Sequence, residues 1–338
     1  MPKNKKKEKD YNHITVNFKK SKAKKKKVPK KSNGKIDWPK YNEQLKQRGS
    51  LDIWISKQAI VNWSAMPNGK RGAQFVYSDS AILTTLLLGI FLNKKLRQTE
   101  GIVSSLFKQM GIFLEVPDFT TISRRSADLK VELPKTEINE RTVLIADSSG
   151  LKVFGEGEWK VRKHGFNKHR TWLKFHIMIN PNGEIRAAKL TGNNIHDAKA
   201  IEDILNQETS ENIEGIAGDG AFDKRNVYET GIKRGFKKYL IPPQKNAKIK
   251  IHGNNKSEPP HPRDENLRAI RKTTLKQWKE KSGYHIRSLV ETTMFRFKTI
   301  FGDRINARKF ANQITEFNIK ARMLNIFHQL GMPEYITG

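Results

Sequence analysis

The chain contains no cysteine, and its acidic residues are few beside its basic ones. Without cysteine there are no disulfides, no zinc sites with thiolate ligands and no cysteine nucleophile. Long apolar runs are missing too: the longest, residues 81–92, falls short of the roughly 20 residues that span a bilayer. The first residues are basic and have no apolar signal core, so we expect the protein to stay in the cytoplasm.

Positive charge is what the chain has in excess. Lys and Arg total 65 and Asp and Glu total 34, which gives a net charge of +31 over 338 residues. A charge so far from zero favours a polyanionic partner, and nucleic acid is the commonest one. An anionic membrane surface is the alternative, but no long basic amphipathic helix stands out.

Composition divides the chain into parts. Residues 1–37 read as a disordered lysine-rich tail: residues 1–35 hold 15 lysines against Glu8 and Asp10, so they carry +13 and the rest carries +18. The tail serves either as a solubilising arm or as a non-specific, salt-dependent phosphate contact. Residues 38–135 and 140–330 form two further units with different patterns.

Residues 38–135 predict a helical domain. A helix capped near Ser78 enters the apolar run, a second spans about 98–110, and a third starts near Asp118 and passes through Arg124 and Arg125. Two helices joined by a short turn, with arginines in the last one, suit docking into the DNA major groove. A plain helical bundle with surface arginines is the alternative, because helix-turn-helix motifs have no strict residue code.

Residues 140–330 predict an α/β unit. Short apolar runs give strands at 141–146, 171–180, 183–190, 213–217 and 236–241, and a helix at 196–205. The turn Pro181-Asn182-Gly183 should join two of these strands in a hairpin. Residues 242–282 are polar and contain two Pro-Pro pairs, so they read as an exposed loop or insert. A helix from Tyr284 and a closing helix from about 314 to 330 follow.

Two acids stand directly after predicted strands, Asp147 and Asp219. A lone Asp in such a place is usually a turn or cap residue, but the ends of strands are also where open α/β sheets bind ligands. A third acid lies on the predicted helix beyond them. One face of that helix carries four residues at helical spacing, Tyr284, Arg287, Glu291 and Lys298.

Three converging carboxylates would repel one another unless cations lay between them. Hard oxygen ligands suit Mg²⁺ or Mn²⁺. Two such ions about 4 Å apart can activate a water or hydroxyl and stabilise the leaving oxygen of a phosphodiester. We therefore predict that Asp147, Asp219 and Glu291 hold two metal ions, chemistry that a strongly basic protein could direct at DNA.

A run of cations lies between the first two predicted strands of this unit: Lys160, Arg162, Lys163, Lys168 and Arg170. Such a run is usually a solvated face, but at the border of the predicted site it favours a path for DNA. Asp197 could be a further ligand, although a helix cap is the better reading. Asp223, four residues beyond Asp219, could support the site.

These residues resemble the acidic triad of insertion-sequence transposases. Asp147 in IADSSGLK, Asp219 in AGDGAFD and Glu291 match that triad, and the Tyr284 to Lys298 face reproduces the Y-x2-R-x3-E-x6-K pattern of the insertion sequence 4 and 5 groups. The runs EWKVRKHGFNKHRTWLKFHI and GNNIHDAKA are similar to the insertion sequence 5 family. The resemblance covers about residues 75–330 and leaves out the lysine tail.

The resemblance implies a ribonuclease H-like core, a mixed sheet flanked by helices that brings the triad together. It implies an enzyme that binds the terminal inverted repeats of its element, hydrolyses double-stranded DNA at each end and joins the freed 3′ ends to target DNA. Arg287 and Lys298 would hold phosphates, and Tyr284 would contact the DNA backbone instead of acting as a nucleophile. Two ends must be joined, so a homodimer is expected, associated with the nucleoid of a bacterium or archaeon.

Two other functions stay open at this point. A domesticated, non-catalytic relative would bind DNA as a regulator, although the presence of every acid favours activity. A ribonuclease H-like nuclease without strand transfer would use the same metal chemistry and would cleave without joining.

Overall fold

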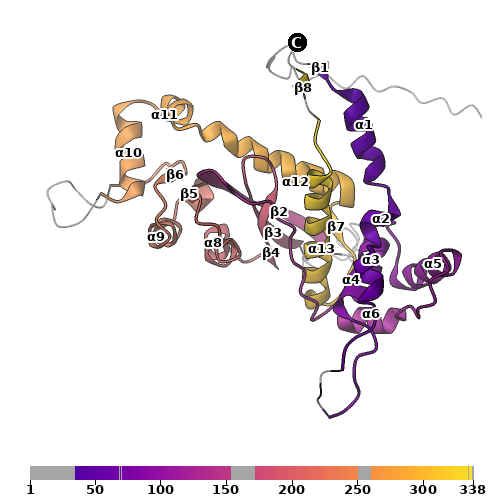
Figure 1. Ribbon diagram of the computed structural model, residues 1–338. Helices are drawn as coiled ribbons and strands as arrows, with labels where there is room; N and C mark the ends of the chain where they lie inside the picture. Colours follow the sequence, from indigo (N-terminus) through magenta and orange to yellow (C-terminus); the bar gives the residue numbers. More distant parts are fainter. Residues whose placement is uncertain are drawn as a thin grey trace, which may run out of the picture.

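The computed structural model describes residues 35–67, 69, 71–153, 172–249, 260–333 and 335–336. Within them a six-stranded mixed sheet forms the centre of the chain (Figure 1). Its strands are β2 (Thr142–Val153), β3 (Trp172–Ile179), β4 (Ile185–Gly192), β5 (Ile213–Ala217), β6 (Lys238–Leu240) and β7 (Arg304–Ile305). The predicted α/β class with a mixed sheet is confirmed.

Strand β2 is the central strand, in the order β4-β3-β2-β5-β6. It runs antiparallel to β3 and parallel to β5, and its last residues pair in parallel with β7. Strands β3 and β4 are antiparallel, whereas β5 and β6 are parallel. The predicted hairpin between β3 and β4 is confirmed, and Gly183 takes the positive φ of 89° that its turn requires.

Helices cover both faces of the sheet (Figure 1). One face packs against α12 (Ser288–Phe301) and α13 (Phe310–Gln329), and the other against α8 (Asp197–Leu205) and α9 (Arg225–Lys233). Side chains alternate along a strand, so Val143 and Ile145 of β2 face α12 and α13, whereas Leu144 and Ala146 face α8 and α9. This alternation decides which helix each side chain of β2 meets.

The N-terminal part is helical, as predicted. Its elements are α1 (Trp38–Gln47), α2 (Leu51–Trp54), α3 (Lys57–Val61), α4 (Asp79–Phe91), α5 (Leu96–Gln109) and α6 (Phe119–Arg125). Their buried side chains, Trp54, Trp63 and Phe107 among them, share one core with Ile319 and Met323 of α13. Helix α13 therefore packs against both the N-terminal helices and the sheet.

The structure differs from the sequence predictions at three places. Residues 110–118 separate α5 from α6, so the short turn expected of a helix-turn-helix is not found there. Strand β2 continues past Asp147 to Val153 instead of ending before it. The polar segment 242–282 contains two helices, α10 (Pro262–Lys272) and α11 (Leu275–Ser282), which bury Leu267 and Trp278.

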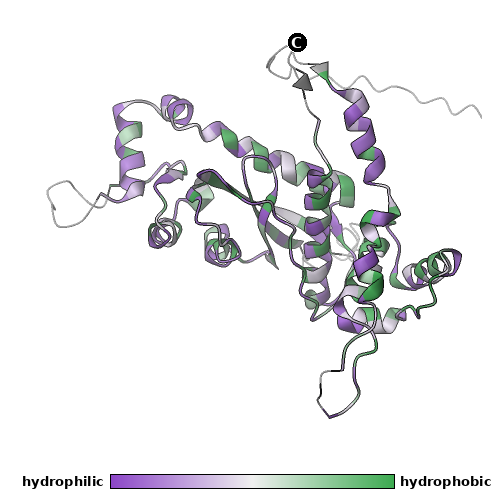
Figure 2. Cartoon of the chain, viewed as in Figure 1, coloured by the Kyte–Doolittle hydropathy of each residue, from purple (hydrophilic) through white to green (hydrophobic). Residues whose placement is uncertain are grey.

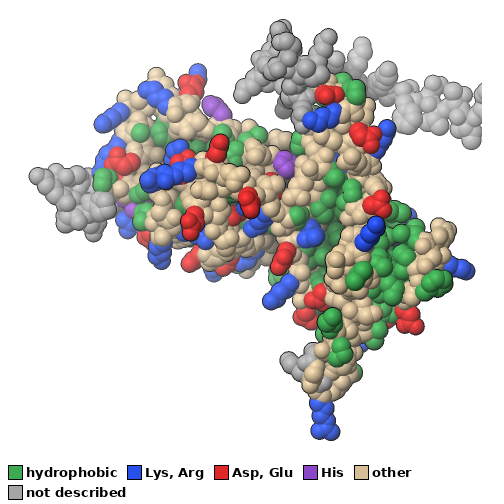
Figure 3. All heavy atoms as spheres, in the orientation of Figure 1, with side chains coloured by type: hydrophobic (Ala, Val, Ile, Leu, Met, Phe, Trp, Pro, Cys, Tyr) green, Lys and Arg blue, Asp and Glu red, His purple; other side chains and the backbone are tan. Residues whose placement is uncertain are grey.

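The surface divides by hydropathy. Hydrophilic residues dominate α10 and α11 (Figure 2), whereas hydrophobic side chains gather over the N-terminal helices on the face that Figure 3 shows. Among the described residues, no helix is both long enough and apolar enough to cross a membrane. A short sheet of β1 (Lys35–Ile36) and β8 (Tyr335–Ile336) pairs the two ends of the described chain.

Candidate active site

Asp147 and Asp219 stand at the same level of two parallel strands. Ile145 of β2 pairs with Ala217, the last residue of β5, and each aspartate lies two residues beyond its member of that pair. Asp147 shares the face of β2 that packs on α12. Asp219 caps the 3-10 turn η1 (Gly220–Phe222), where its Oδ1 accepts a hydrogen bond of 2.8 Å from the Ala221 amide.

Arg287 connects two of the three predicted acids. Its guanidinium donates to Asp147 Oδ2 at 3.0 Å and to Glu291 Oε1 at 2.5 Å. Arg287 lies in the 3-10 turn η2 (Tyr284–Arg287), and Glu291 lies in the first turn of α12. The predicted single helix thus begins as a 3-10 turn, which still places Arg287 one turn before Glu291 and against β2.

Lys298 and Tyr284 extend the site in opposite directions along this segment. The Lys298 ammonium donates to Ser149 Oγ at 2.7 Å, two residues beyond Asp147 on the same face of β2. The Tyr284 ring lies 6.0 Å from the Trp278 ring and 5.2 Å from the Lys279 ammonium of α11. Two cations, Arg287 and Lys298, and the Tyr284 phenol therefore lie in a row beside the acids.

The charges of Asp219 and Glu291 act on the Asp147 carboxyl. Burial raises the pKa of the Asp147 carboxyl, and the charges of Asp219 and Glu291 raise it further, whereas the Ser148 amide and Arg287 lower it. Burial also raises the pKa of the Tyr284 hydroxyl. The Arg287 charge lowers this pKa, and the charges of the same three acids raise it further. The side chains of Asp147 and Arg287 are mostly buried, and that of Glu291 is 56% exposed.

Comparison with known proteins matches the chain to one family. A family model described as "Transposase DDE domain" matches residues 138–326, more than half of the chain, and a second model with the same description matches residues 46–156. The chain belongs to the DDE transposase domain family. The match over residues 138–326 contains Asp147, Asp219 and Glu291, together with the cations that line them.

A solved structure also matches over most of this transposase chain. It is the Drosophila P element transposase strand transfer complex, with 11% sequence identity, 85% of this chain and 86% of that chain covered, and a TM-score of 0.28. At that TM-score the likeness is too weak to indicate a shared fold.

The acids of the transposase site fit metal ions by chemistry, but Arg287 lies between them. Carboxylate oxygens are the ligands that Mg²⁺ and Mn²⁺ prefer, and Asp147 feels the charges of both other acids. In the described part of the chain, no three His, Asp or Glu side chains are close enough together to hold a metal ion as placed. The guanidinium occupies Asp147 Oδ2 and Glu291 Oε1, so it is the cation that these oxygens now share.

The other residues predicted to contact DNA differ in where the structure places them. The cation run Lys160, Arg162, Lys163, Lys168 and Arg170 lies outside the described residues. Arg125 already donates to the Tyr77 carbonyl at 2.7 Å and to Asp79 at 2.5 Å, and it covers the Phe75 ring. Arg124 is exposed and donates only to Thr121 among the described residues. The DNA contacts of both arginines stay predictions.

Asp197 does not cap its helix. The N-cap of α8 is His196, whose ring nitrogen accepts from the Ala198 amide at 3.3 Å. Asp197 pairs with Lys174 at 3.2 Å and lies 3.6 Å from His176. His176 pairs in register with Ser148 of β2, so this cluster lies on the sheet face opposite Asp147.

Sequence reasoning missed the partner of Asp223. Its buried carboxylate accepts from Arg263 of α10 at 2.7 and 3.0 Å, from the Gln244 amide at 2.9 Å and from the Tyr228 hydroxyl at 3.3 Å. The Asp223–Arg263 pair therefore anchors the segment 242–282 to the loop that carries Asp219. No pattern in the sequence could have paired an arginine of a polar segment with an acid 40 residues earlier.

Proposed function

We propose that this protein is the transposase of an insertion sequence of the insertion sequence 5 family. It binds the terminal inverted repeats of its element, hydrolyses a phosphodiester at each end and joins the freed 3′ ends to target DNA. The observation that carries the proposal is the contact of Arg287 with both Asp147 and Glu291, beside Lys298. Phosphate-binding cations next to an acidic set are what DNA cleavage requires.

The strand order supports a ribonuclease H-like core. An antiparallel hairpin, a central strand and parallel strands on its other side follow one another in the sheet. This order places an acid in the central strand and an acid after its parallel neighbour at one level of the sheet. The third acid arrives from a helix that packs on the same face.

Asp147, Asp219 and Glu291 would hold two Mg²⁺ or Mn²⁺ ions. The ions would supply Lewis-acid stabilisation of the attacking and leaving oxygens. Arg287 holds two of the required oxygens, so it must release them when metal binds. A DNA phosphate is also an anion and can accept two hydrogen bonds from the guanidinium. DNA that reaches Arg287 would therefore replace the carboxylates of Asp147 and Glu291 as its partners.

Helix α11 supports a route for DNA towards Tyr284. It presents Lys276, Lys279 and Lys281 in the turns that precede η2, and Lys279 covers the Tyr284 ring. Exposed lysines track a phosphate backbone in a salt-dependent way and read no sequence. The DNA strand would then pass from α11 over Tyr284 and Arg287 to Lys298 on α12.

We infer that two copies act together as a homodimer. Large apolar side chains stand exposed on the N-terminal part, with Phe113 at 99%, Met66 at 91% and Val61 at 78% exposed. Exposed apolar side chains of this size are candidates for contact with a second copy of the chain. Sedimentation of the protein with and without duplex ends should show two copies in the DNA complex. Only monomeric complexes would contradict the inference.

The experiment that tests the function uses DNA that flanks the gene. Purified protein with Mg²⁺ should cut a duplex that carries the inverted repeats found there and should leave 3′-hydroxyl ends. The same protein should join those ends to a target plasmid. A duplex with scrambled ends is the matched control, and removal of Mg²⁺ by EDTA should stop both steps.

The outcomes separate the candidate functions. Cutting without joining would indicate a nuclease. Specific binding of the ends without any cutting in Mg²⁺ or Mn²⁺ would indicate a DNA-binding regulator. Equal treatment of the scrambled duplex would remove the assignment of inverted repeats as its substrate.

A further inference from the structure

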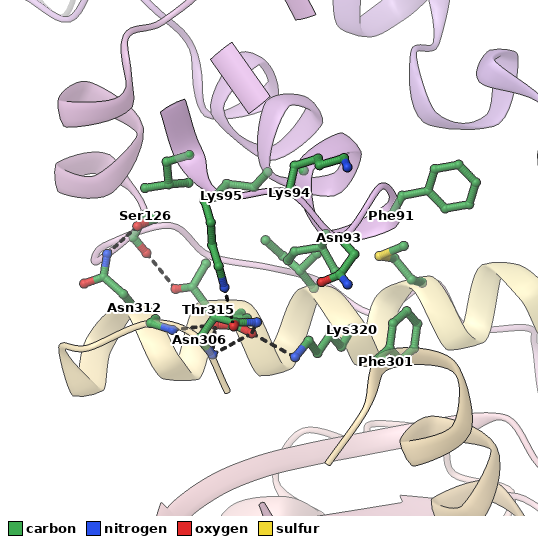
Figure 4. A pocket seen from close by; sticks show the side chains of 18 of the residues that line it. Phe91, Asn93, Lys94, Lys95, Ser126, Phe301, Asn306, Asn312, Thr315 and Lys320 are labelled. Carbon is green, nitrogen blue, oxygen red and sulfur yellow. Dashed lines mark hydrogen bonds and ion pairs between the residues drawn. The ribbon is translucent and has the colours of Figure 1, made fainter. Parts of the chain in front are cut away.

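Aromatic rings line the cavity of about 660 Å³ that lies between the N-terminal helices and α13 (Figure 4), but other side chains cover them. Phe301 and Phe327 stack on each other with their centroids 6.3 Å apart, and Trp54 and Arg48 also lie against Phe327. These rings belong to the core of the protein and offer no open face to a ligand. Phe295 of α12 is different, because it is 70% exposed.

Phe295 lies on α12 between two residues of the candidate active site, Glu291 and Lys298. The helix rises about 6 Å from Glu291 to Phe295 and about 4.5 Å from Phe295 to Lys298. At offsets of four and three residues, the three side chains lie on one side of the helix. Lys298 turns towards Ser149 of β2, whereas Glu291 and Phe295 are exposed. The ring therefore stands at the solvent edge of the row of side chains that passes the acids.

The surface of α12 around Phe295 has little to offer a polar partner. Thr292 and Thr299 are exposed and lie three and four residues from Phe295. Their hydroxyls donate within the helix, to the carbonyls of Ser288 at 3.1 Å and of Phe295 at 2.8 Å. In the described part of the chain, no other aromatic ring and no cation lies against the Phe295 ring. The ring is therefore open to an apolar or aromatic ligand.

A DNA strand brings such a ligand to this place. In the path proposed above, the strand passes from Arg287 to Lys298 and so crosses α12 beside Phe295. The acids would hold the phosphate that is cleaved, and Lys298 would meet the next phosphate along the strand. Between two consecutive phosphates lie a sugar and its base, which are the least polar parts of the strand. An aromatic side chain stacks on a base of any sequence.

We propose that Phe295 enters the bound duplex beside the cleaved phosphodiester and stacks on the base of the adjoining nucleotide. The proposal rests on the proposed function, because DNA must lie along α12. Apolar side chains such as Phe can insert between base steps and interrupt the stack. The ring then holds the strand at that step, so the phosphodiester beside it stays at the acids. Phe295 adds position along the strand to the grip that Arg287 and Lys298 have on its phosphates.

Crosslinking from position 295 of the full chain tests the contact. p-Benzoylphenylalanine takes the place of Phe295 and on irradiation couples to C–H groups that it contacts. The probe is a labelled duplex with the inverted repeat found beside the gene, kept uncut by EDTA. A protein–DNA product should form, with the coupled nucleotide next to the position that is cut in Mg²⁺. The same amino acid in place of Ile232, which is 47% exposed on α9 across the sheet, should give none.

Removal of the base should have the same effect as removal of the ring. Phe295→Ala should cut the intact duplex about tenfold more slowly, which is the size of effect that loss of one ring–base stack has. Wild type should be slowed by a similar factor on a duplex with one abasic site at the crosslinked nucleotide. Phe295→Ala should cut that abasic duplex as fast as wild type does, because the contact is already lost.

Three further variants separate the ring from the fold. Phe295→Tyr keeps a flat ring and should keep most of the cutting rate, whereas Phe295→Leu keeps only an apolar side chain and should not. Ile232→Ala is the matched control and should cut both duplexes as wild type does. Phe295 is exposed, so Phe295→Ala should keep the urea midpoint of wild type.

The outcomes distinguish this proposal from the proposed function. A gel shift of the intact duplex by wild type reports DNA binding directly, and its absence overturns both proposals. A normal shift with crosslinks from position 295 only to a second copy of the chain, or to nothing, overturns the contact with DNA alone. Effects of Phe295→Ala and of the abasic site that multiply also overturn it, because independent losses add in free energy.

Discussion

Arg287 donates to Asp147 at 3.0 Å across 140 residues of sequence. The same guanidinium donates to Glu291 at 2.5 Å, so one cation joins an acid of the central strand to an acid of a helix. The two terminal nitrogens of the planar Arg287 guanidinium can each donate to a different carboxylate. The contact holds the acids close together, yet it also uses the oxygens that metal ions would need.

Replacement of Arg287 by Gln should therefore raise the affinity of the DNA-free protein for Mn²⁺. Hydrogen bonds to charged groups are worth about 1.5–3 kcal/mol, so removal of the competing donor should change the affinity roughly tenfold. DNA cleavage should fall, because the phosphate loses its partner. Calorimetric titration with Mn²⁺ measures the affinity.

Lys298→Gln is the matched control for that titration. Lys298 contacts Ser149 and none of the three acids, so its loss should weaken DNA binding and leave Mn²⁺ affinity unchanged. Equal or weaker Mn²⁺ binding by Arg287→Gln would show that Arg287 does not compete with metal for these oxygens.

Glu291→Gln should lower cleavage at least ~100-fold and leave duplex binding intact. A metal site supplies several kcal/mol of charge stabilisation, and each 1.36 kcal/mol is tenfold in rate. The amide keeps the shape of the exposed side chain but loses the charged ligand. Cleavage rate and gel shift are measured on one duplex, with Glu280→Gln on α11 as the control. Cleavage that survives in Glu291→Gln refutes the assignment of this acid.

The elements that carry the predicted acids were predictable because their sequence patterns are local. Asp219 lies two residues beyond the end of the apolar strand β5, and Arg287, Glu291 and Lys298 recur at helical spacing. The parallel pairing of β2 and β5 places Asp219 at the level of Asp147, and the packing of α12 on β2 brings Arg287 and Lys298 to that strand. The family membership predicted from these residues is confirmed, and the assignment to the insertion sequence 5 family stays a prediction.

The parts that escaped prediction depend on long-range contacts. Residues 147–150 (Asp-Ser-Ser-Gly) break the apolar pattern, yet β2 continues through them because β3 pairs with it along that whole stretch. Helices α10 and α11 are polar and bury little beyond Leu267 and Trp278. Their sequences therefore lack the hydrophobic periodicity from which a helix is predicted. The turn η2 follows Gly283, whose φ of 74° breaks the helix before Tyr284.

Asp223→Ala should destabilise the fold by about 3 kcal/mol, because it leaves the Arg263 guanidinium without its buried partner. Cleavage should fall as well, since the segment 242–282 loses its anchor beside Asp219. Urea denaturation measures the stability. Asp203→Ala is the control: Asp203 forms an exposed pair with Lys189, and its loss should cost less than about 1 kcal/mol. Equal midpoints for the two variants would contradict the anchoring role.

His176 should make the fold sensitive to acid. Burial lowers its pKa to about 4 from 6.5, against the pull of Asp197 and with the help of Lys174 and Lys189. The unfolded chain binds the proton first as pH falls, so stability is complete above pH 6.5 and is lost between 6.5 and 4, by about 3 kcal/mol in all. His176→Gln should remove that part of the pH dependence, measured by urea denaturation at several pH values. His285→Gln, an exposed histidine, should leave the wild-type dependence in place, and an unchanged slope in His176→Gln would show that other groups carry the acid sensitivity.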